Sequence, residues 1–427
     1  MENEQVGGWI DAKAAAERLG VKPATLYAYV SRGVLRRRHA ADGRRSLFDA
    51  AQVEELARRG RPRRPPGPGE LAIESAITAL GADRPYYRGR DVLAMAGSRT
   101  FEDVAGWLWT GEDAAGGDAA GAAPWRPSGE GVAAAVAAQS GLPAGLLPLD
   151  RLQLIVTALA ATDPLRHHLG AEGVTATGRA LVSGLVEALP PAAGPASGAG
   201  RPPGAGGVAE RLWSRLCPHP PEPGGGLPRA FEAAMILLAD HELAASTVAA
   251  RVAASVRADP YAVVASGLGV LSGPLHGGAS YAAERLIAEV AEPVEAARVL
   301  GERLRGGERI PGFGHGVYKS GDARFTLLIG LVRAAAPGHE RLAAADAVLA
   351  EAERRRLPAP NVDFALAALG AVAGLVPGAG EALFAVARTA GWLAHALEEY
   401  ARRGPLRPRA VYVGPPPPEP APKSRRP

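Results

Sequence analysis

The chain has 427 residues, of which 47% are hydrophobic and 22% charged, a balance typical of a soluble globular protein with a large core. Its single cysteine, Cys217, excludes an intrachain disulfide, and no apolar run reaches membrane-spanning length, so we expect a cytoplasmic protein. Residues 1–64 carry a net charge of +6 and the remainder −2, which indicates a separate N-terminal module with an anionic partner.

The N-terminal module, expected over residues 1–60, shows short helical and extended patterns. Apolar spacing predicts helices over Asp11–Leu19 and Ala24–Arg32, and a third helix over Asp49–Arg59 with its first residue as N-cap. Two strands, Val34–Arg38 and Arg45–Phe48, form a predicted two-stranded wing. This winged helix–turn–helix pattern resembles the N-terminal DNA-binding domain of the MerR and excisionase class.

That resemblance implies DNA as a partner of the module. The candidate DNA contacts are Lys22, Thr25, Tyr27, Arg32, Arg36 and Arg37. The cationic side chains would contact phosphates, and a dimer would present two modules, as a palindromic site requires. The alternative is a solvated basic face on a small helical domain used for protein contacts or regulation.

The rest of the chain predicts an all-α body over residues 70–414. A Pro/Arg-rich linker precedes it at 61–69, and a disordered Pro-rich tail follows at 415–427. Ala/Gly/Pro-rich stretches at 114–127 and 190–207 predict exposed loops. We expect no strands outside the wing. Apolar residues recur at helical spacing in seven segments, which are Ser75–Leu80, Phe101–Trp109, Leu152–Ala161, Arg229–Ala239, Ser246–Val256, Ala282–Val290 and Leu383–Glu399.

Three glycine-rich or apolar stretches of this body each carry one ionisable side chain suited to acid–base chemistry. His276 lies in GPLHGG, His315 in PGFGH and Asp363 in NVDF. Glycine lets a substrate approach the backbone closely, and an aspartate in an apolar run has a raised pKa. We predict that Asp363 removes a proton next to a carbonyl, that His276 stabilises the enolate oxygen, and that His315 polarises a second carbonyl. Together these roles describe an aldol or Claisen condensation.

Cationic side chains are expected to clamp the anionic substrate of such a reaction. Arg324, Arg388 and Arg407 are the candidates, because arginine binds carboxylates through two parallel hydrogen bonds. His241, in Asp-His-Glu, is a further donor, and we expect no metal there because no other histidine lies nearby. Two alternatives are structural: Asp363 as a helix N-cap, and His395 as a surface or packing residue.

The motifs around these residues resemble those of the citrate synthase family, which includes methylcitrate synthases. The resemblance covers roughly residues 69–414 and keeps the family's order. Its motifs are Tyr87-Arg88-Gly89, FEDVAGWLWTG from Phe101, ADHELAAST from Ala239, GPLHGG from Gly273, PGFGHGVYKSGDAR from Pro311, NVDF from Asn361, ARTAGWLAHALEEY from Ala387 and RPRAVYVG from Arg407. It implies an all-α homodimer whose large and small domains close over oxaloacetate, with the small domain at roughly 278–374.

The resemblance also implies a role for each matching residue. His276 and Asp363 would enolise acetyl-CoA, while His315 would activate the oxaloacetate carbonyl. The residues that would hold the dicarboxylate are His241, Arg324, Arg388 and Arg407, the last reaching in from the partner subunit. Those that would bind CoA are Lys319, Gly314 and Gly316. No metal or tightly held cofactor is implied.

The sequence departs from the family pattern at four positions, which bear on CoA affinity, substrate choice and rate. They are Gly316 in place of Arg, Ala323 in place of Pro, and Ala244 and Ser280 in place of Asn. We therefore predict an acyltransferase that condenses acetyl-CoA with oxaloacetate to citrate and CoA. The alternatives are a 2-methylcitrate synthase using propionyl-CoA, a citryl-CoA lyase, or a DNA-binding regulator that uses the fold as a metabolite sensor. The intact base favours an enzyme.

Overall fold

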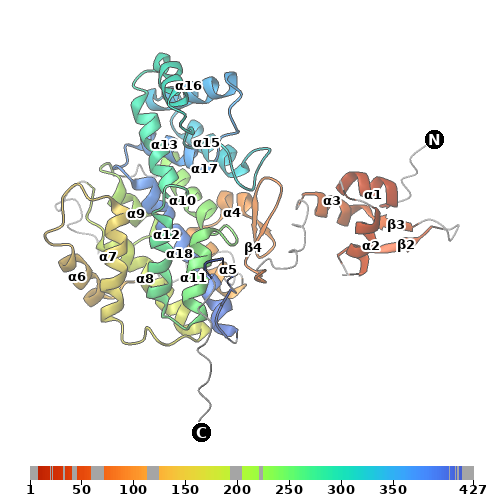
Figure 1. The fold of residues 1–427 in the computed structure, drawn as a ribbon. Coiled ribbons are helices and arrows are strands. Elements are labelled where there is room, and N and C mark those ends of the chain that lie inside the picture. Colours follow the sequence, from red (N-terminus) through yellow and green to blue (C-terminus); the bar gives the residue numbers. More distant parts are fainter. Residues whose placement is uncertain are drawn as a thin grey trace, which may run out of the picture.

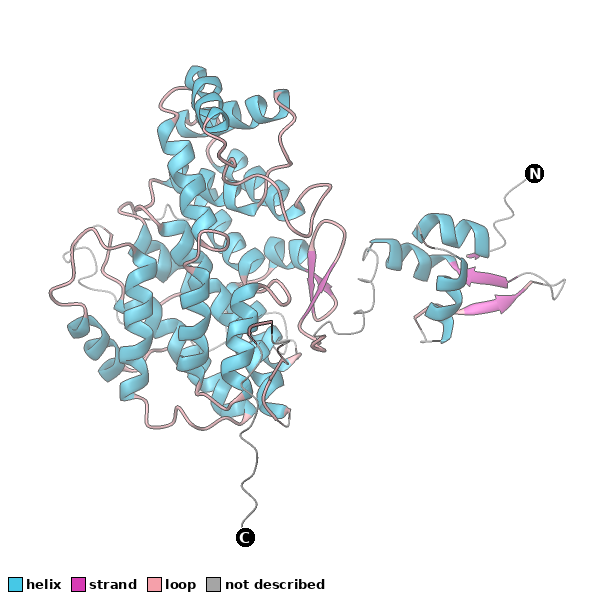
Figure 2. Ribbon diagram, viewed as in Figure 1, coloured by secondary structure: helices cyan, strands magenta, loops and turns pink. Residues whose placement is uncertain are grey.

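The computed structural model describes residues 8–19, 21, 23–31, 34–40, 46–58, 72–112, 125–192, 204–220, 225–402, 404–408, 410 and 413–415. These residues form an N-terminal module of helices and strands and a larger, mostly helical body (Figures 1 and 2). Each part has a hydrophobic core of its own. The predicted linker at 61–69 and the tail from 416 onward lie outside the described residues, as do Lys22 and Arg32.

The N-terminal module packs its helices against a three-stranded antiparallel sheet of order β1-β3-β2. Its elements are β1 (Trp9–Asp11), α1 (Ala12–Leu19), α2 (Pro23–Ser31), β2 (Arg37–His39), β3 (Ser46–Asp49) and α3 (Ala50–Arg58). The three predicted helices are confirmed, and Asp49 Oδ1 caps α3 by accepting the N–H of Ala51 and Gln52. The prediction of a two-stranded wing was incomplete, because β1 adds a third strand that pairs with β3. A strand of three residues is too short to show alternation.

A second small sheet shows that the expectation of strands only in the wing was wrong. The strands β4 (Thr78–Leu80), β5 (Pro85–Tyr87) and β6 (Arg90–Asp91) form an antiparallel meander. The predicted helix Ser75–Leu80 is therefore wrong, since its second half is β4, paired with β5. The β5–β6 turn needs a left-handed backbone, with φ of 45° at Arg88 and 82° at Gly89.

The body consists mainly of helices packed around one hydrophobic core. They are α4 (Val92–Ser98), α5 (Phe101–Thr110), α6 (Gly129–Ala138), α7 (Pro148–Thr162), α8 (Ala171–Ala188), α9 (Val208–Leu216), α10 (Gly226–Leu238), α11 (Ala245–Ser255), α12 (Pro260–Leu271), α13 (Gly278–Glu289), the 3-10 helix η3 (Pro293–Glu295), α14 (Ala296–Arg305), α15 (Ala323–Ala335), α16 (Glu340–Arg354), α17 (Val362–Ala373) and α18 (Ala379–Ala401). The six other predicted segments coincide with these helices to within two residues at their C-terminal ends.

Helix α18 is the central element of the body. It is buried along nearly its whole length and packs against α5, α7, α8, α10, α11, α12 and α13. A helix with apolar residues on all sides is expected in such an interior position. Helices α13 to α17 gather at the top of the body in Figure 1, and the His276, His315 and Asp363 motifs lie before α13, between α14 and α15, and at the start of α17.

Candidate active site

Two motif loops are joined by backbone hydrogen bonds at the N-terminus of α17. The Gly314 N–H donates to Ala359 O at 2.7 Å, and the Asn361 N–H donates to Gly312 O at 2.9 Å. The Asn361 side chain also donates to Gly314 O at 2.8 Å. Gly312 has a φ of 81°, and a Cβ there would lie 2.8 Å from Phe364 Cβ. The close approach of the PGFGH and NVDF motifs therefore requires glycine at this position.

This junction forms one wall of a cavity of about 360 Å³, which contains most of the predicted site. The side chains and glycines that line it are His241, Ala244, Ala245, Leu275, His276, Ala279, Gly314, His315, Gly316, Val317, Arg324, Asn361, Val362, Asp363, Phe384 and Arg388. All three predicted acid–base residues and three of the four predicted dicarboxylate ligands thus share one cavity.

Asp363 lies in the first turn of α17 with its carboxylate free for chemistry. The N-cap is Asn361, whose side chain accepts the Asp363 N–H at 3.0 Å, so the capping alternative for Asp363 is wrong. Asp363 Oδ1 accepts a hydrogen bond from Ser280 Oγ at 2.5 Å. Burial raises the pKa of Asp363, and the Ser280 hydrogen bond and the Arg324 charge offset part of that rise. The result is a carboxylate with more basic strength than an exposed one.

His276 precedes α13 and is held by a hydroxyl from α11. Its Nε2 lies 2.7 Å from Ser246 Oγ, which also accepts the indole N–H of Trp392 at 3.2 Å. The indole can only donate, so the Ser246 hydroxyl hydrogen is free to be donated to His276 Nε2, a pairing in which the ring proton lies on Nδ1. Burial and the Arg388 charge lower the pKa of His276 to about 4, so the ring is neutral at pH 7.

His315 has the opposite tautomer. Its Nδ1 accepts the backbone N–H groups of Val317 and Tyr318, at 3.0 and 3.1 Å, so the ring proton lies on Nε2. Burial and the Arg324 charge lower the pKa of His315 to about 4, and this ring is also neutral at pH 7. Nε2 lies 3.3 Å from Arg324 Nη2. His315 Nε2–H and the Arg324 guanidinium are thus two neighbouring donors with no acceptor between them. A substrate oxygen placed there could accept a hydrogen bond from each.

Arg324, in the first turn of α15, is fixed by its neighbour Asp322. Its Nε donates to Asp322 Oδ1 at 3.0 Å and its Nη2 to Oδ2 at 2.9 Å. Oδ2 also accepts the N–H of Val362 at 3.1 Å, which ties α15 to α17. Burial acts to lower the pKa of Arg324, but the Asp322 charge outweighs it and the net pKa is raised. The guanidinium therefore stays charged and oriented toward the cavity.

Arg388, in the middle of α18, is a buried cation with an unsatisfied donor. Its Nε donates to Leu238 O at 2.7 Å, whereas its Nη1 has no hydrogen-bond partner among the described residues. Burial lowers the pKa of Arg388, as expected for a charge removed from water without a paired carboxylate. A carboxylate in the adjacent cavity would supply the missing partner.

His241 lies in the loop between α10 and α11, beside the other two imidazoles. Its Nε2 is 2.9 Å from Tyr318 Oη, and its ring packs edge-on against His315 with the centroids 5.3 Å apart.

Ala244, the N-cap of α11 in the same loop, makes no side-chain cap hydrogen bond, at a cost of about 1 kcal/mol relative to Asn.

Two predicted ligands are not brought into this cavity within one chain. Lys319 is exposed, and its Nζ donates to His315 O at 3.1 Å, outside the cavity lining. Arg407 is also exposed, on a segment where the Leu406 N–H donates to Ser255 Oγ. Ser255 is at the far end of α11 from Ser246, roughly 14 Å along the helix axis.

Several supporting side chains were not assigned roles from the sequence. They are Ser246, Ser280, Tyr318, Asp322 and Asn361. Four lie inside one of the family motifs, and Ser280 lies two residues after GPLHGG. Position in a motif was the available signal, but a hydroxyl or amide acquires its role only from the group that it faces in the fold.

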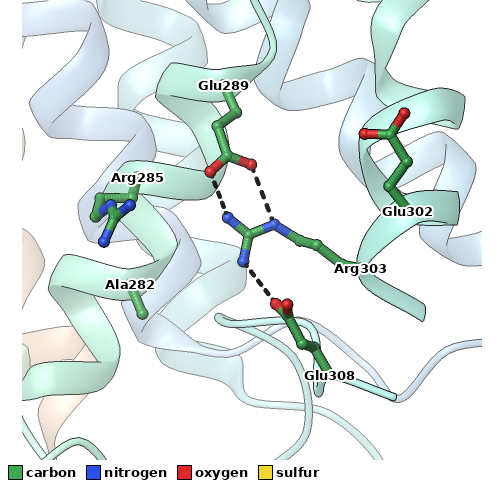
Figure 3. A pocket seen from close by; sticks show the side chains of 6 residues that line it. All are labelled: Ala282, Arg285, Glu289, Glu302, Arg303 and Glu308. Atoms are coloured by element: carbon green, nitrogen blue, oxygen red, sulfur yellow. Dashed lines mark hydrogen bonds and ion pairs between the residues drawn. The ribbon is translucent and has the colours of Figure 1, made fainter. Parts of the chain in front are cut away.

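Another cleft, of about 440 Å³, lies between α13 and α14 but does not suit a small anion (Figure 3). Its Arg303 is already paired with Glu289 at 2.7 Å and with Glu308 at 3.4 Å.

In the described part of the chain, no group of three or more His, Cys, Asp or Glu is placed to hold a metal ion. No helix within the described ranges is long and apolar enough to cross a membrane.

In the N-terminal module, the described DNA-contact candidates are Thr25 and Tyr27 on α2, Arg37 on the edge strand β2, and Arg36 just before that strand. Tyr27, Arg36 and Arg37 are exposed, Thr25 is half-buried, and the Arg37 guanidinium stacks over the Tyr27 ring at 5.6 Å. The neighbouring Arg38 is exposed and stacks over Trp9 at 4.5 Å.

Comparison with known proteins finds relatives over the helical body. A family model described as citrate synthase, C-terminal domain, matches residues 68–409. Citrate synthase 2 of Bacillus subtilis is 38% identical over 216 residues, which span 49% of this chain and 56% of that protein. A 2-methylcitrate synthase of Mycobacterium tuberculosis is 31% identical over 343 residues, spanning 77% and 84%. The crystal structure of citrate synthase from Thermotoga maritima has a TM-score of 0.62 and 27% identity, covering 84% and 98%.

Proposed function

Because the chain belongs to the citrate synthase family, we propose that it is an acyltransferase that joins an acyl-CoA thioester to oxaloacetate in a Claisen condensation. One observation carries the proposal. A carboxylate with a raised pKa lines a single cavity together with two neutral imidazoles whose hydrogen-bond partners lie on opposite ring nitrogens, Nε2 of His276 and Nδ1 of His315. Such a set can remove a proton from one carbonyl compound and polarise another.

The first step is formation of the enolate of the thioester. Asp363 takes a proton from the carbon next to the thioester carbonyl, and His276 donates its Nδ1–H to the carbonyl oxygen as negative charge develops. A neutral imidazole serves here because its hydrogen bond strengthens as the oxygen gains charge. Ser246 and Trp392 hold the His276 ring in the tautomer that this step needs.

In the second step the enolate carbon attacks the keto carbon of oxaloacetate. The keto oxygen receives hydrogen bonds from His315 Nε2–H and Arg324 as it becomes an alkoxide, and it is then protonated. Arg324, Arg388 and His241 hold the two carboxylates. Hydrolysis of the new thioester releases the tricarboxylate and CoA. CoA is part of the substrate, and the scheme uses no metal or organic cofactor.

The acyl group separates two versions of the proposal. Acetyl-CoA would give citrate and propionyl-CoA would give 2-methylcitrate, and the similar proteins carry both names. We place acetyl-CoA first, and because the two acyl groups differ by one methylene, the cavity of about 360 Å³ does not separate them by volume. A citryl-CoA lyase would use the same side chains in reverse.

A homodimer is part of this proposal. The fourth predicted ligand, Arg407, is exposed and remote from the cavity of its own chain, so it would act in the site of a second copy. A cytoplasmic location is also proposed, because the single cysteine, Cys217, is buried and leaves no role for disulfides.

The test is release of free thiol by the purified protein with oxaloacetate and either acetyl-CoA or propionyl-CoA, with mass analysis of the product. We expect oxaloacetate-dependent thiol release and a tricarboxylate product, faster with acetyl-CoA. Thiol release that is independent of oxaloacetate would indicate a hydrolase instead. Cleavage of citryl-CoA without measurable condensation would favour the lyase.

A second function, DNA binding, is proposed for the N-terminal module, which we interpret as a winged helix–turn–helix. The supporting observation is the strand β2, whose Arg37, Arg38 and His39 are all exposed next to an exposed Tyr27. Adjacent cations and an aromatic ring on one edge suit a phosphate backbone. A salt-dependent mobility-shift assay on genomic fragments tests this role.

The matched variants are Arg37→Ala with Arg38→Ala, compared with Arg18→Ala. Arg18 carries the same charge but is paired with Glu54 between α1 and α3. We expect the double variant to lose binding and the Arg18 variant to keep most of it. No shift at low salt with the wild-type protein would remove the DNA role.

A further inference from the structure

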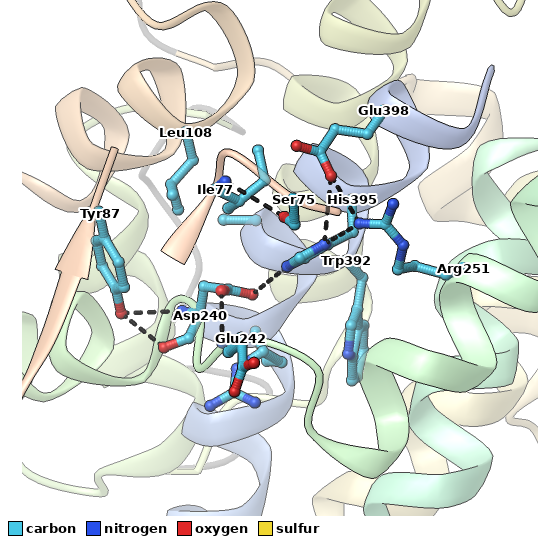
Figure 4. Close-up of polar contacts among 12 residues, drawn as sticks. Ser75, Ile77, Tyr87, Leu108, Asp240, Glu242, Arg251, Trp392, His395 and Glu398 are labelled. Atoms are coloured by element: carbon cyan, nitrogen blue, oxygen red, sulfur yellow. Dashed lines mark hydrogen bonds and ion pairs between the residues drawn. The ribbon is translucent and has the colours of Figure 1, made fainter. Parts of the chain in front are cut away.

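A chain of buried ionisable side chains runs from the His241 loop to the C-terminal end of α18 (Figure 4). Asp240, Arg251, His395 and Glu399 all have side chains that are at most 1% exposed. None of them lines the cavity. Buried charges are costly unless they are paired, so this arrangement requires a structural or functional reason.

The hydrogen-bond pattern fixes the tautomer of His395. Arg251 Nη1 lies 2.6 Å from His395 Nδ1, and a guanidinium can only donate, so Nδ1 is the acceptor and the ring proton lies on Nε2. Nη1 also donates to Glu398 Oε2 at 2.6 Å, and Nη2 pairs with Glu399. Arg251, on α11, is thus anchored to the last turns of α18.

The Nε2–H of His395 points to Asp240, the residue before His241. Nε2 lies 3.4 Å from Asp240 Oδ1, an ion-pair contact longer than an ordinary hydrogen bond, and neither atom has a hydrogen-bond partner in the described part of the chain. Burial acts to raise the pKa of Asp240, but His395 and Arg388 outweigh it and the net pKa is lowered. Asp240 is therefore a buried carboxylate that faces the polar edge of His395.

Asp240 is also fixed through its backbone and its second oxygen. Its N–H donates to Tyr87 Oη at 2.9 Å, and Oδ2 accepts the N–H of Glu242 at 3.0 Å. A Cβ at Gly391 of α18 would lie 2.3 Å from Asp240 Oδ1, so only glycine lets the loop lie against the helix here. The residues on either side of His241 are thus held in place through Asp240.

We propose that His395 is a positioning residue for the substrate, because it bridges Arg251 and Asp240 and so sets the place of the His241 ring in the cavity. The inference rests on the proposed function, in which His241 binds oxaloacetate. His395 touches no substrate. It acts on the dicarboxylate site through Asp240 and has no comparable link to Asp363 or His276.

Two substitutions separate the bridging role from simple packing. His395→Gln keeps an acceptor for Arg251 and a donor that reaches Asp240. His395→Asn places its amide near the former Nδ1, so it can still face Arg251 but is too short to reach Asp240. Both variants remove the ring and leave a neutral amide. They differ in the link to the His241 loop.

The experiment is calorimetric titration of the full-length wild-type protein and both variants with oxaloacetate, together with steady-state kinetics. We expect the Gln variant to bind within about twofold of the wild type, and the Asn variant to bind about tenfold more weakly. The Asn variant should raise KM for oxaloacetate while kcat and KM for the acyl-CoA change little. A loss of folded protein would instead lower apparent kcat at an unchanged KM.

Wild-type affinity in the Asn variant, or equal weakening in both variants, would overturn the inference. If the Asn variant does not fold, the Gln variant decides: native affinity supports the bridge, and weakened affinity refutes it. Absence of oxaloacetate binding by the wild-type protein would refute the proposed function and the inference with it. If the wild-type protein binds oxaloacetate and neither substitution changes that affinity, the inference is refuted while the proposed function stands.

Discussion

The hydroxyl of Ser280 donates a hydrogen bond to Asp363 Oδ1 across 2.5 Å, which links the proposed base on α17 to helix α13. Burial raises the pKa of Asp363, and this hydrogen bond to the charged form acts in the opposite direction. The basicity of Asp363 is therefore set by two opposing effects, of which burial is the larger. Removing the Ser280 hydroxyl would remove one of the effects that lower the pKa of Asp363, so this pKa would rise.

Ser280→Ala is expected to shift the acid limb of the pH profile of kcat/KM upward, by about one pH unit. Asp363 must be ionised to accept a proton, so activity rises with pH through its pKa, and a higher pKa moves that rise to higher pH. Both imidazoles have a pKa of about 4 and are hydrogen-bonded to groups other than Ser280, so the substitution should not move their titration. Ser98→Ala, an exposed serine on α4, is the control. An unmoved acid limb would contradict the assignment of Asp363 as the titrating base.

Arg388→Lys is expected to weaken oxaloacetate binding roughly 10- to 100-fold. The arginine holds Leu238 O with Nε and leaves Nη1 for a carboxylate, and a single ammonium cannot serve both positions. Thermal unfolding with and without oxaloacetate measures the effect, because a ligand that binds only the folded state raises Tm. The control is Arg333→Lys, an exposed arginine paired with Asp346. An equal rise in Tm in both variants would count against Arg388 as a ligand.

Glu284→Gln is expected to stabilise the protein above pH 7 by about 2 kcal/mol and to have little effect near pH 4. Burial raises the pKa of Glu284 to about 7, while its carboxylate accepts the Gly378 N–H. The unfolded chain ionises this group at lower pH, so the wild type loses stability from about pH 4.5 to 7. The amide keeps an acceptor for Gly378 and removes the charge. Burial and, to a smaller extent, the Glu284 charge raise the pKa of Glu381 to about 7, so removing that charge adds to the gain.

Urea unfolding of both proteins between pH 4 and 8 checks this prediction. The difference in the free energy of unfolding should grow between about pH 4.5 and 7 and then level off. A constant difference across that range would show that Glu284 has no unusual titration.

Deletion of residues 1–64 is expected to leave kcat and KM for condensation unchanged within about twofold. The N-terminal module and the body have separate hydrophobic cores, and the cavity is lined only by residues of the body. Circular dichroism confirms that the truncated protein is folded. Loss of condensation in a folded truncation would show that the module contributes to the active site.

Six helical segments of the body were predicted correctly because their apolar residues repeat at helical spacing over nine or more positions. Helix α18 is an example, since its apolar repeat runs through nearly the whole segment from Leu383 to Glu399. The sheet β4–β6 could not be found in this way, because its strands have two or three residues and no measurable period. The helix predicted over 75–80 was wrong for the same reason, since a pattern of six residues cannot distinguish a helix from a short strand next to a turn.

The three acid–base residues were predictable because each lies in a motif with its own local signature. Their tautomers were not, because these depend on partners far away in the chain, such as Ser246 for His276. His395 was expected to be a surface or packing residue, whereas it is fully buried within a charged network. That role depends on Arg251 from another helix, which no local pattern reveals. Arg407 remains a prediction, because its proposed place is in a second copy of the chain.

The most direct measurement is the effect of Asp363→Ala on two quantities, oxaloacetate-dependent thiol release from acetyl-CoA and oxaloacetate affinity by calorimetry. Removal of the base should lower thiol release at least about 10³-fold, while the dicarboxylate ligands His241, Arg324 and Arg388 keep oxaloacetate affinity within a few-fold. Asp346→Ala, a half-buried aspartate on α16 that is paired with Arg333, should change neither quantity. Undiminished thiol release by the Asp363 variant would contradict the proposed condensation mechanism.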